Sequence, residues 1–108
     1  MKKKVFVNHT NQISAQWSAE KLKAASEYGE IVDLPCPKIS PSSDEIEIQN
    51  LAKKKFFEIM NLSPEAVFCQ CEFSYLYALV TLLKKQDVTV LTASFDETDN
   101  SFVRFRKC

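Results

Sequence analysis

The sequence predicts an α/β fold: a Rossmann-like, mostly parallel sheet with helices on both faces and a C-terminal antiparallel strand. Short runs rich in β-branched and aromatic residues alternate with segments of helical periodicity. The chain has 108 residues, of which 45% are hydrophobic and 26% charged, as in an average globular protein. These observations predict a single domain over residues 1–108.

The first strand is predicted over residues 3–7, which end in a β-branched and aromatic run. A helix over residues 15–28 follows, and Ser14 is in a position to cap it. Four apolar side chains can share one face of this helix: Trp17, Leu22, Ala25 and Tyr28. Gly29 then stops the helix, and residues 30–34 are expected to form the second strand.

Residues 36–43 contain two prolines and are predicted to form a loop. Ser42 and Glu45 have the spacing of a capping box, which indicates that a second helix starts there. Its apolar face is expected to hold Ile48, Leu51, Ala52, Phe56 and Ile59. The lysines at 53–55 lie mostly off that face, so a solvated surface is favoured over a nucleic-acid patch. Pro64 ends the helix.

The third strand is predicted over residues 66–70, whose unbroken apolar character suits burial on both faces. Residues 73–85 have helical periodicity, with an inward face expected to hold Phe73, Leu76, Leu79, Val80 and Leu83. A fourth strand over residues 88–93 is followed by a polar turn at 96–100. Residues 101–106 are then expected to pair back antiparallel on the fourth strand.

Charge and hydropathy exclude several classes of protein. The 14 Lys and Arg residues balance the 14 Asp and Glu residues, so no net field favours binding to DNA. The uncharged run at residues 73–83 is far shorter than the roughly twenty apolar residues of a membrane span. The lysine-rich start is followed by an apolar run that stops at Asn8, too early for a secretory signal. A cytoplasmic protein that does not bind membranes is predicted.

Cysteine, histidine and glycine usage limits the possible chemistry. The four cysteines match neither a paired zinc motif nor a dense disulfide framework, and we expect reduced thiols: Cys36, Cys69, Cys71 and Cys108. Cys69 is expected in the core and Cys108 at the surface. His9 is the sole histidine, and Gly29 is the sole glycine, which excludes glycine-rich phosphate loops. No metal and no cofactor are predicted.

Candidate binding residues follow the predicted strands, because ligands of open parallel sheets bind at the carboxyl ends of the strands. Residues 8–12 are five consecutive uncharged side chains that can form hydrogen bonds: Asn8, His9, Thr10, Asn11 and Gln12. Gln70, Glu72, Phe73 and Ser74 follow the third strand and lead into a helix N-terminus, and Ser94 follows the fourth. Hydroxyls, amides and a helix N-terminus suit a phosphodiester or a ribose, and Phe73 or Phe95 could stack on a base.

Each candidate also has a purely structural interpretation. Residues 8–12 can form a polar loop whose side chains satisfy nearby backbone groups. Glu72 can complement the dipole of the helix that it precedes. His9 can be a hydrogen-bonded loop residue, although it is the one side chain that titrates near neutral pH. Ser94 can start a turn, and Arg104 and Arg106 can discourage aggregation at a sheet edge.

Three segments resemble a known family: VFVNHT at residues 5–10 with Gln12 after it, VFCQCEF at 67–73, and VLTAS at 90–94. They are similar to small standalone proteins encoded beside type III CRISPR systems, which are single-domain relatives of the CARF sensors of cyclic oligoadenylate. The resemblance extends from residue 4 to about residue 106. It implies a homodimeric, metal-independent ring nuclease that binds cyclic tetra-adenylate and linearises it by attack of a 2′-hydroxyl.

The resemblance also implies roles for individual residues. The expected catalytic residues are His9, Asn8 and Ser74, with His9 as the possible general acid or base. The expected ligand-binding residues are Thr10, Gln12, Gln70, Glu72, Phe73 and Ser94. Two alternatives remain open: a protein that sequesters the cyclic nucleotide without cleaving it, and an interaction protein that binds no nucleotide.

Overall fold

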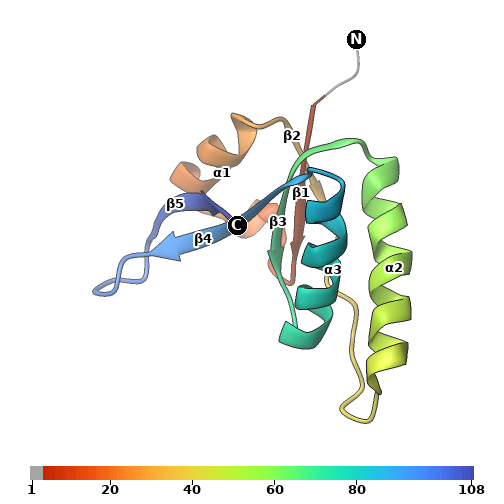
Figure 1. Cartoon of the computed structure of the whole chain (residues 1–108). Helices are drawn as coiled ribbons and strands as arrows, with labels where there is room; N and C mark the ends of the chain where they lie inside the picture. The colour runs from red at the N-terminus through yellow and green to blue at the C-terminus, as the bar shows by residue number, and fades with distance from the viewer. Residues whose placement is uncertain (1–3) are drawn as a thin grey trace.

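The computed structural model describes residues 4–108. Within this range, five strands form one sheet in the order β2-β1-β3-β4-β5 (Figure 1). β1 to β4 are parallel, and β5 runs antiparallel to β4. The strands are β1 (Val5–Thr10), β2 (Glu30–Asp33), β3 (Pro64–Gln70), β4 (Thr89–Phe95) and β5 (Phe102–Lys107). The predicted α/β fold with a closing antiparallel strand is confirmed.

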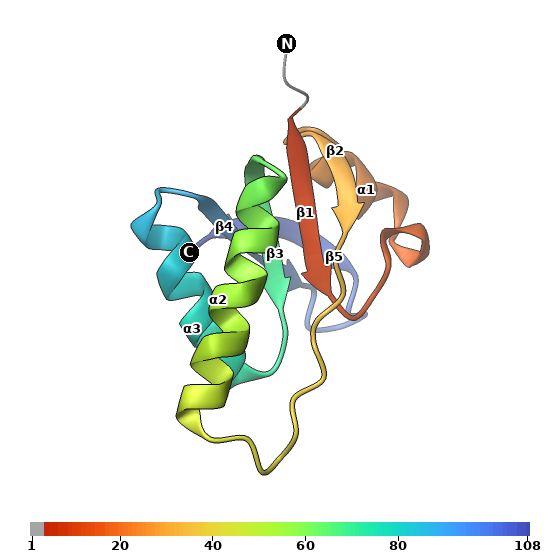
Figure 2. The same cartoon turned by 90° about the vertical axis from the view of Figure 1, so that its right-hand side faces the viewer.

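Helices cover both faces of the sheet, as Figure 1 shows. The short 3-10 helix η1 (Ser14–Gln16) and α1 (Ala19–Ser26) lie on one face, and α2 (Glu45–Asn61) and α3 (Phe73–Lys85) lie on the other, in front of the sheet in Figure 2. Among residues 4–108, no helix combines the length and the apolar character needed to cross a bilayer.

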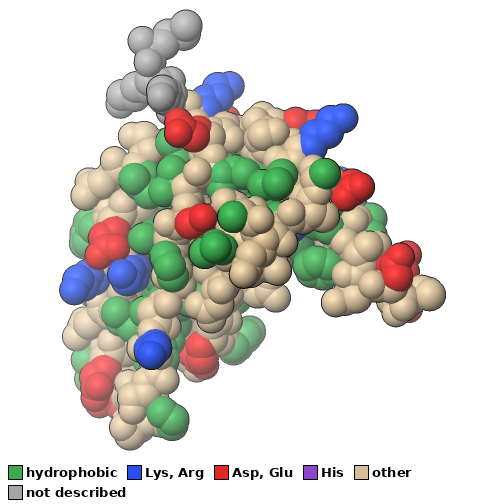
Figure 3. All heavy atoms as spheres, turned by 180° about the vertical axis from the view of Figure 1, so that it is seen from behind, with side chains coloured by type: hydrophobic (Ala, Val, Ile, Leu, Met, Phe, Trp, Pro, Cys, Tyr) green, Lys and Arg blue, Asp and Glu red, His purple; other side chains and the backbone are tan. Residues whose placement is uncertain are grey.

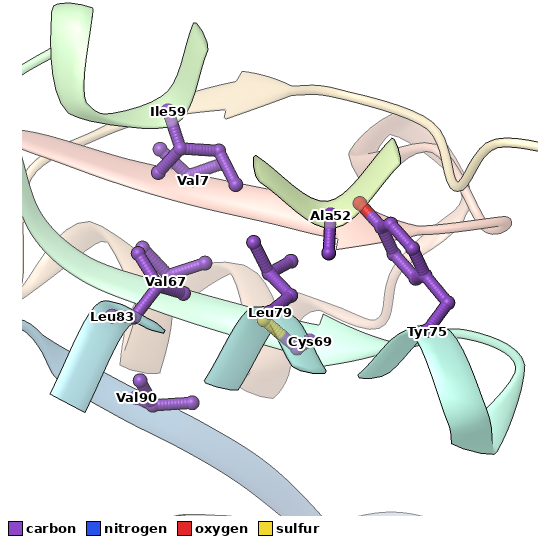
Figure 4. Packing of buried hydrophobic residues seen from close by; sticks show 9 residues of the cluster. All are labelled: Val7, Ala52, Ile59, Val67, Cys69, Tyr75, Leu79, Leu83 and Val90. Atoms are coloured by element: carbon purple, nitrogen blue, oxygen red, sulfur yellow. The ribbon is translucent and has the colours of Figure 1, made fainter. Parts of the chain in front are cut away.

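Alternate residues of β1, β3 and β4 enter two separate cores. Val7, Val67 and Val90 pack against Leu79 and other residues of α2 and α3 (Figure 4). The intervening residues pack with Trp17 on the α1 face: Phe6, Ala66, Phe68, Leu91 and Phe105. Neighbouring residues of one strand therefore lie on opposite faces of the sheet. As a result, the predicted site residues of β1 do not all lie on the same face.

β1 is longer at its carboxyl end than predicted. It pairs with a strand on each side, so Asn8 lies opposite Asp33 of β2, and Thr10 lies opposite Gln70 of β3. Pairing with β2 as far as Asn8 and with β3 as far as Thr10 keeps these polar residues extended. The prediction that Asn8, His9 and Thr10 form a loop is wrong: all three are strand residues and are buried.

The first two helices begin at different residues from those predicted. Ser14 begins η1, and Ser18 caps α1 by accepting a hydrogen bond from the backbone of Lys21. Asp44, and not Ser42, caps α2 by accepting a hydrogen bond from Glu47 N. Each segment offers several residues that are good caps, and packing decides which of them is used.

The core faces of the longer helices largely agree with the periodicity. Ala52 and Ile59 of α2 are fully buried, and the other three predicted residues of that face pack against them. α3 has the predicted bounds. Phe73, which was predicted to point inward, is 76% exposed, and Tyr75 is buried in the core instead. Lys53 and Lys54 are exposed, as predicted for a solvated face.

Two cysteines form a disulfide, which corrects the expectation of four reduced thiols. Cys36 follows β2 and Cys71 follows β3, and the two sulfurs are bonded across 35 residues of sequence. β2 and β3 both pair with β1, so the loops at their carboxyl ends meet beyond the end of β1. Cys69 is buried and Cys108 is exposed, as predicted.

Candidate functional site

β3 and β4 separate at their carboxyl ends. Their pairing stops at Phe68 and Leu91, whereas β4 continues to Phe95 with β5 as its only partner among the described strands. The β4–β5 hairpin therefore projects from the body of the molecule as a lobe (Figure 3). This separation opens the sheet at the carboxyl ends of its parallel strands, which is where open parallel sheets bind ligands.

An open hollow of about 710 Å³ lies at this separation. We call it the edge hollow, and its lining comes from β1, α1, β3 and the β4–β5 hairpin: Thr10, Asn11, Gln12, Lys21, Gln70, Phe95 and Asn100. Four side-chain amides, one hydroxyl, one ammonium and one aromatic ring line it. Such a set can bind phosphate oxygens and the edges and face of a base.

The edge hollow lies beside the topological switch point of the sheet. After β1 the chain crosses one face of the sheet as α1 and returns as β2, beside β1. After β3 it crosses the other face as α3 and returns as β4, on the opposite side of the β1–β3 pair. The two crossovers leave in opposite directions and so leave the ends of β1 and β3 uncovered. Thr10 and Gln70 are the last residues of these two strands.

Asn8 lies behind the edge hollow and is held by its neighbours. Its Nδ2 donates to Asp33 Oδ1 at 2.8 Å and to Gln12 O at 2.9 Å, and its Oδ1 accepts from Thr10 Oγ1 at 2.8 Å. Asp33 also accepts hydrogen bonds from the backbone and hydroxyl of Ser14. Asn8, Thr10 and Asp33 therefore fix the loop that presents Gln12, and sequence reasoning missed Asp33.

His9 points to the opposite face of the sheet and is completely buried. Its Nδ1 lies 2.6 Å from Leu34 O, and its Nε2 lies 2.6 Å from the hydroxyl of Tyr75. A carbonyl oxygen can only accept, so Nδ1 carries the hydrogen and Nε2 of the neutral ring accepts from Tyr75. Burial lowers the pKa of His9, which favours this neutral ring. A role in proton transfer stays a prediction, and the imidazole does not line the edge hollow.

Glu72 occupies the helix N-terminus that was predicted to bind phosphate. Its carboxylate accepts hydrogen bonds from Ser74 N at 3.0 Å and from Tyr75 N at 3.1 Å. The bond from Ser74 and then that from Tyr75 lower the pKa of Glu72. The structural interpretation of Glu72 is confirmed: it caps α3.

Phe73 and Ser74 lie away from the edge hollow. Both line a different hollow, between α2 and α3, together with Glu45 and Ile48. Ser94 lies in β4 opposite Arg104, and its Oγ donates to the carbonyl of Arg104 at 3.3 Å. The alternative structural interpretation, in which Ser94 starts a turn, is therefore wrong.

The structure thus brings together three of the nine predicted site residues, namely Thr10, Gln12 and Gln70. The other six are divided between the sheet interior, the α3 cap, the α2–α3 hollow and β4. Within residues 4–108, no group of three or more His, Cys, Asp and Glu side chains could hold a metal ion.

Lys21 is a site residue that sequence reasoning missed. It lies on α1, is 6% exposed, and its Nζ is 4.4 Å from the ring centre of Trp17. Burial lowers the pKa of its ammonium. The spacing of Lys21 in the sequence could have revealed it. Lys21 lies four residues after Trp17 and four before Ala25, which places a charged residue on the predicted apolar face of the helix.

Residues 2–98 match the family described as Uncharacterized protein MJ1673 family. The chain belongs to this family. The matched span includes β1 to β4 and ends in the turn before β5, so it contains every lining residue of the edge hollow except Asn100. A comparison with curated proteins finds no match.

Proposed function

We propose that the chain binds cyclic tetra-adenylate at the edge hollow and linearises it without a metal ion. The separation of β3 from β4 carries this proposal, because it opens the switch-point edge of the sheet to a ligand. The polar lining, with Phe95 as its aromatic residue, suits a nucleotide. The sequence resemblance to proteins encoded beside type III CRISPR systems supplies the identity of the ring.

The proposed reaction is a transesterification. The 2′-oxygen of one ribose bonds to the adjacent phosphorus, and the bond from that phosphorus to the 5′-oxygen breaks. The proton of the 2′-hydroxyl is released and the 5′-oxygen takes up a proton, so no atom is gained or lost. The products are a 2′,3′-cyclic phosphate and a 5′-hydroxyl.

The protein's contribution to this reaction is to hold the ring in an in-line geometry. Gln12 and Gln70 are exposed at the ends of β1 and β3 and can bond to phosphate and ribose oxygens. A ring of repeated nucleotides suits two copies of the chain related by a two-fold axis, each presenting the same edge hollow.

Sequestration without cleavage is the second candidate function, and the burial of His9 favours it. Both ring nitrogens of this sole histidine bond inside the protein. If no other group transfers a proton, a bound ring persists, and the protein removes the nucleotide from solution by binding alone.

Incubation of excess protein with cyclic tetra-adenylate and EDTA, followed by chromatography, separates the two functions. We expect linear products, with one ring bound per two chains in sedimentation. Gln70→Ala should weaken binding by roughly tenfold through loss of one hydrogen bond to a charged phosphate. Gln49→Ala on α2 is the matched control and should bind as the parent does.

Each other outcome has a distinct meaning. Retention of the intact ring supports sequestration. Absence of binding refutes both functions. Cleavage that stops in EDTA and returns with added magnesium refutes the metal-independent reaction.

A further inference from the structure

Lys21 is a largely buried lysine whose ammonium forms no ion pair within residues 4–108. Among residues 4–108, no carboxylate oxygen lies within the 4.0 Å of an ion pair from its Nζ, and Nζ donates no hydrogen bond. Aromatic rings surround it instead: Nζ lies 4.4 Å from the ring centre of Trp17, 4.9 Å from Phe68 and 5.7 Å from Phe95.

Packing accounts for the stem of Lys21 but not for its charge. The stem lies among aromatic rings, whereas Nζ reaches the solvent of the hollows that Lys21 lines. Contacts with the ring faces stabilise the charged ammonium. Methionine could fill the same apolar space without a charge. The accessible ammonium, which forms no ion pair among residues 4–108, can therefore bind an anion from outside the chain.

The surroundings of Lys21 also show where that anion would enter. Lys21 lines the edge hollow and a second, adjoining hollow bounded by η1 and the β4–β5 turn. Gln12, Phe95 and Asn100 line both hollows as well. Glu20 is the one acidic residue among the described lining residues of either hollow, and it forms no ion pair with Lys21.

We propose that Lys21 binds a phosphate group of a nucleotide whose base stacks on Phe95. Phe95 is 39% exposed, and its ring is close enough to Nζ for one nucleotide to contact both. The side-chain amides of Gln12, Gln70 and Asn100 can bond to the base edge and the ribose. This inference rests on the proposed function for the position of the nucleotide, and it adds the residue that recognises its phosphate.

The test compares adenosine 5′-monophosphate with adenosine by calorimetry. The parent protein should bind the monophosphate at least about tenfold more tightly than the nucleoside, because hydrogen bonds to charged groups are strong. Lys21→Met should remove this difference, and Lys21→Arg should keep part of it. Lys23→Met, at an exposed lysine of the same helix, is the matched control and should keep all of it.

A second measurement does not depend on any variant folding. The Lys21 ¹³Cε resonance of the parent protein is titrated with pH, with and without adenosine 5′-monophosphate. A bound phosphate favours the charged ammonium and should raise the pKa of Lys21. An unchanged titration would overturn the proposal.

These experiments separate the two proposals. Equal binding of monophosphate and nucleoside, or no binding of the monophosphate at all, overturns the role of Lys21 even if cyclic tetra-adenylate is cleaved. A Lys21-dependent preference for the monophosphate, together with no binding of the ring, supports Lys21 as a phosphate ligand and refutes the cyclic nucleotide as its source.

Discussion

Mild acidification, to about pH 5.5, should destabilise this protein mainly through His9. His9 is the sole histidine, and burial lowers its pKa from the ordinary value of 6.5. The hydrogen bond to Leu34 O acts in the opposite direction, and the charges of Lys55 and Glu58 on α2 act in opposite senses. The folded state therefore binds a proton less readily than the unfolded chain does.

The sign and size of the effect follow from this difference in proton binding. Well above pH 6.5 neither state holds the proton, and the neutral ring contributes its full stability. Below pH 6.5 the unfolded chain takes up a proton that the folded state resists, so the free energy of unfolding falls as pH falls. Between about pH 7 and about pH 5.5 the loss is at most about 1.3 kcal/mol, the value for a folded ring that stays neutral.

Urea unfolding of the parent and of His9→Gln at both pH values measures this loss. Glutamine can keep one hydrogen bond but does not titrate, so the variant should be less stable at both pH values and should lack the parent's loss on acidification. An equal pH dependence in both proteins would assign it to other groups. Higher stability of the parent at the lower pH would mean that the pKa of His9 is raised, which would refute the burial argument.

Three further predictions concern stability. Cys36→Ser should lower the free energy of unfolding by about 4 kcal/mol through loss of a closed loop, and Cys108→Ser should leave it unchanged in guanidinium unfolding without reductant. Tyr75→Phe should cost about 1 to 3 kcal/mol in urea unfolding, because it leaves the buried Nε2 of His9 without its donor; an unchanged midpoint would contradict that bond. Gly29→Ala should lower Tm, because Gly29 has a φ of 154° and an added Cβ would lie 2.4 Å from a backbone oxygen; a Tm equal to the parent's would show that this turn relaxes freely.

Local patterns in the sequence determine the elements and their order. The apolar spacing of residues 73–85 predicts α3 with its observed bounds, because a helix follows the periodicity of its own side chains. The face of α2 that holds Ala52 and Ile59 is predicted for the same reason. Alternation of strands and helices then limits the topology to a mostly parallel sheet, since few connections between such units are possible.

The site depended on contacts that no local pattern contains. Residues 8–10 are strand and not loop because β3 pairs with all three of them and β2 pairs with Asn8. Once they are extended, Asn8 and His9 must point to opposite faces of the sheet, so these two neighbours cannot belong to one site. The disulfide and the surroundings of Lys21 likewise join segments far apart in the chain: Cys36 meets Cys71, and Lys21 meets Phe68 and Phe95. A sequence shows which side chains are available, and only the tertiary structure decides which of them meet.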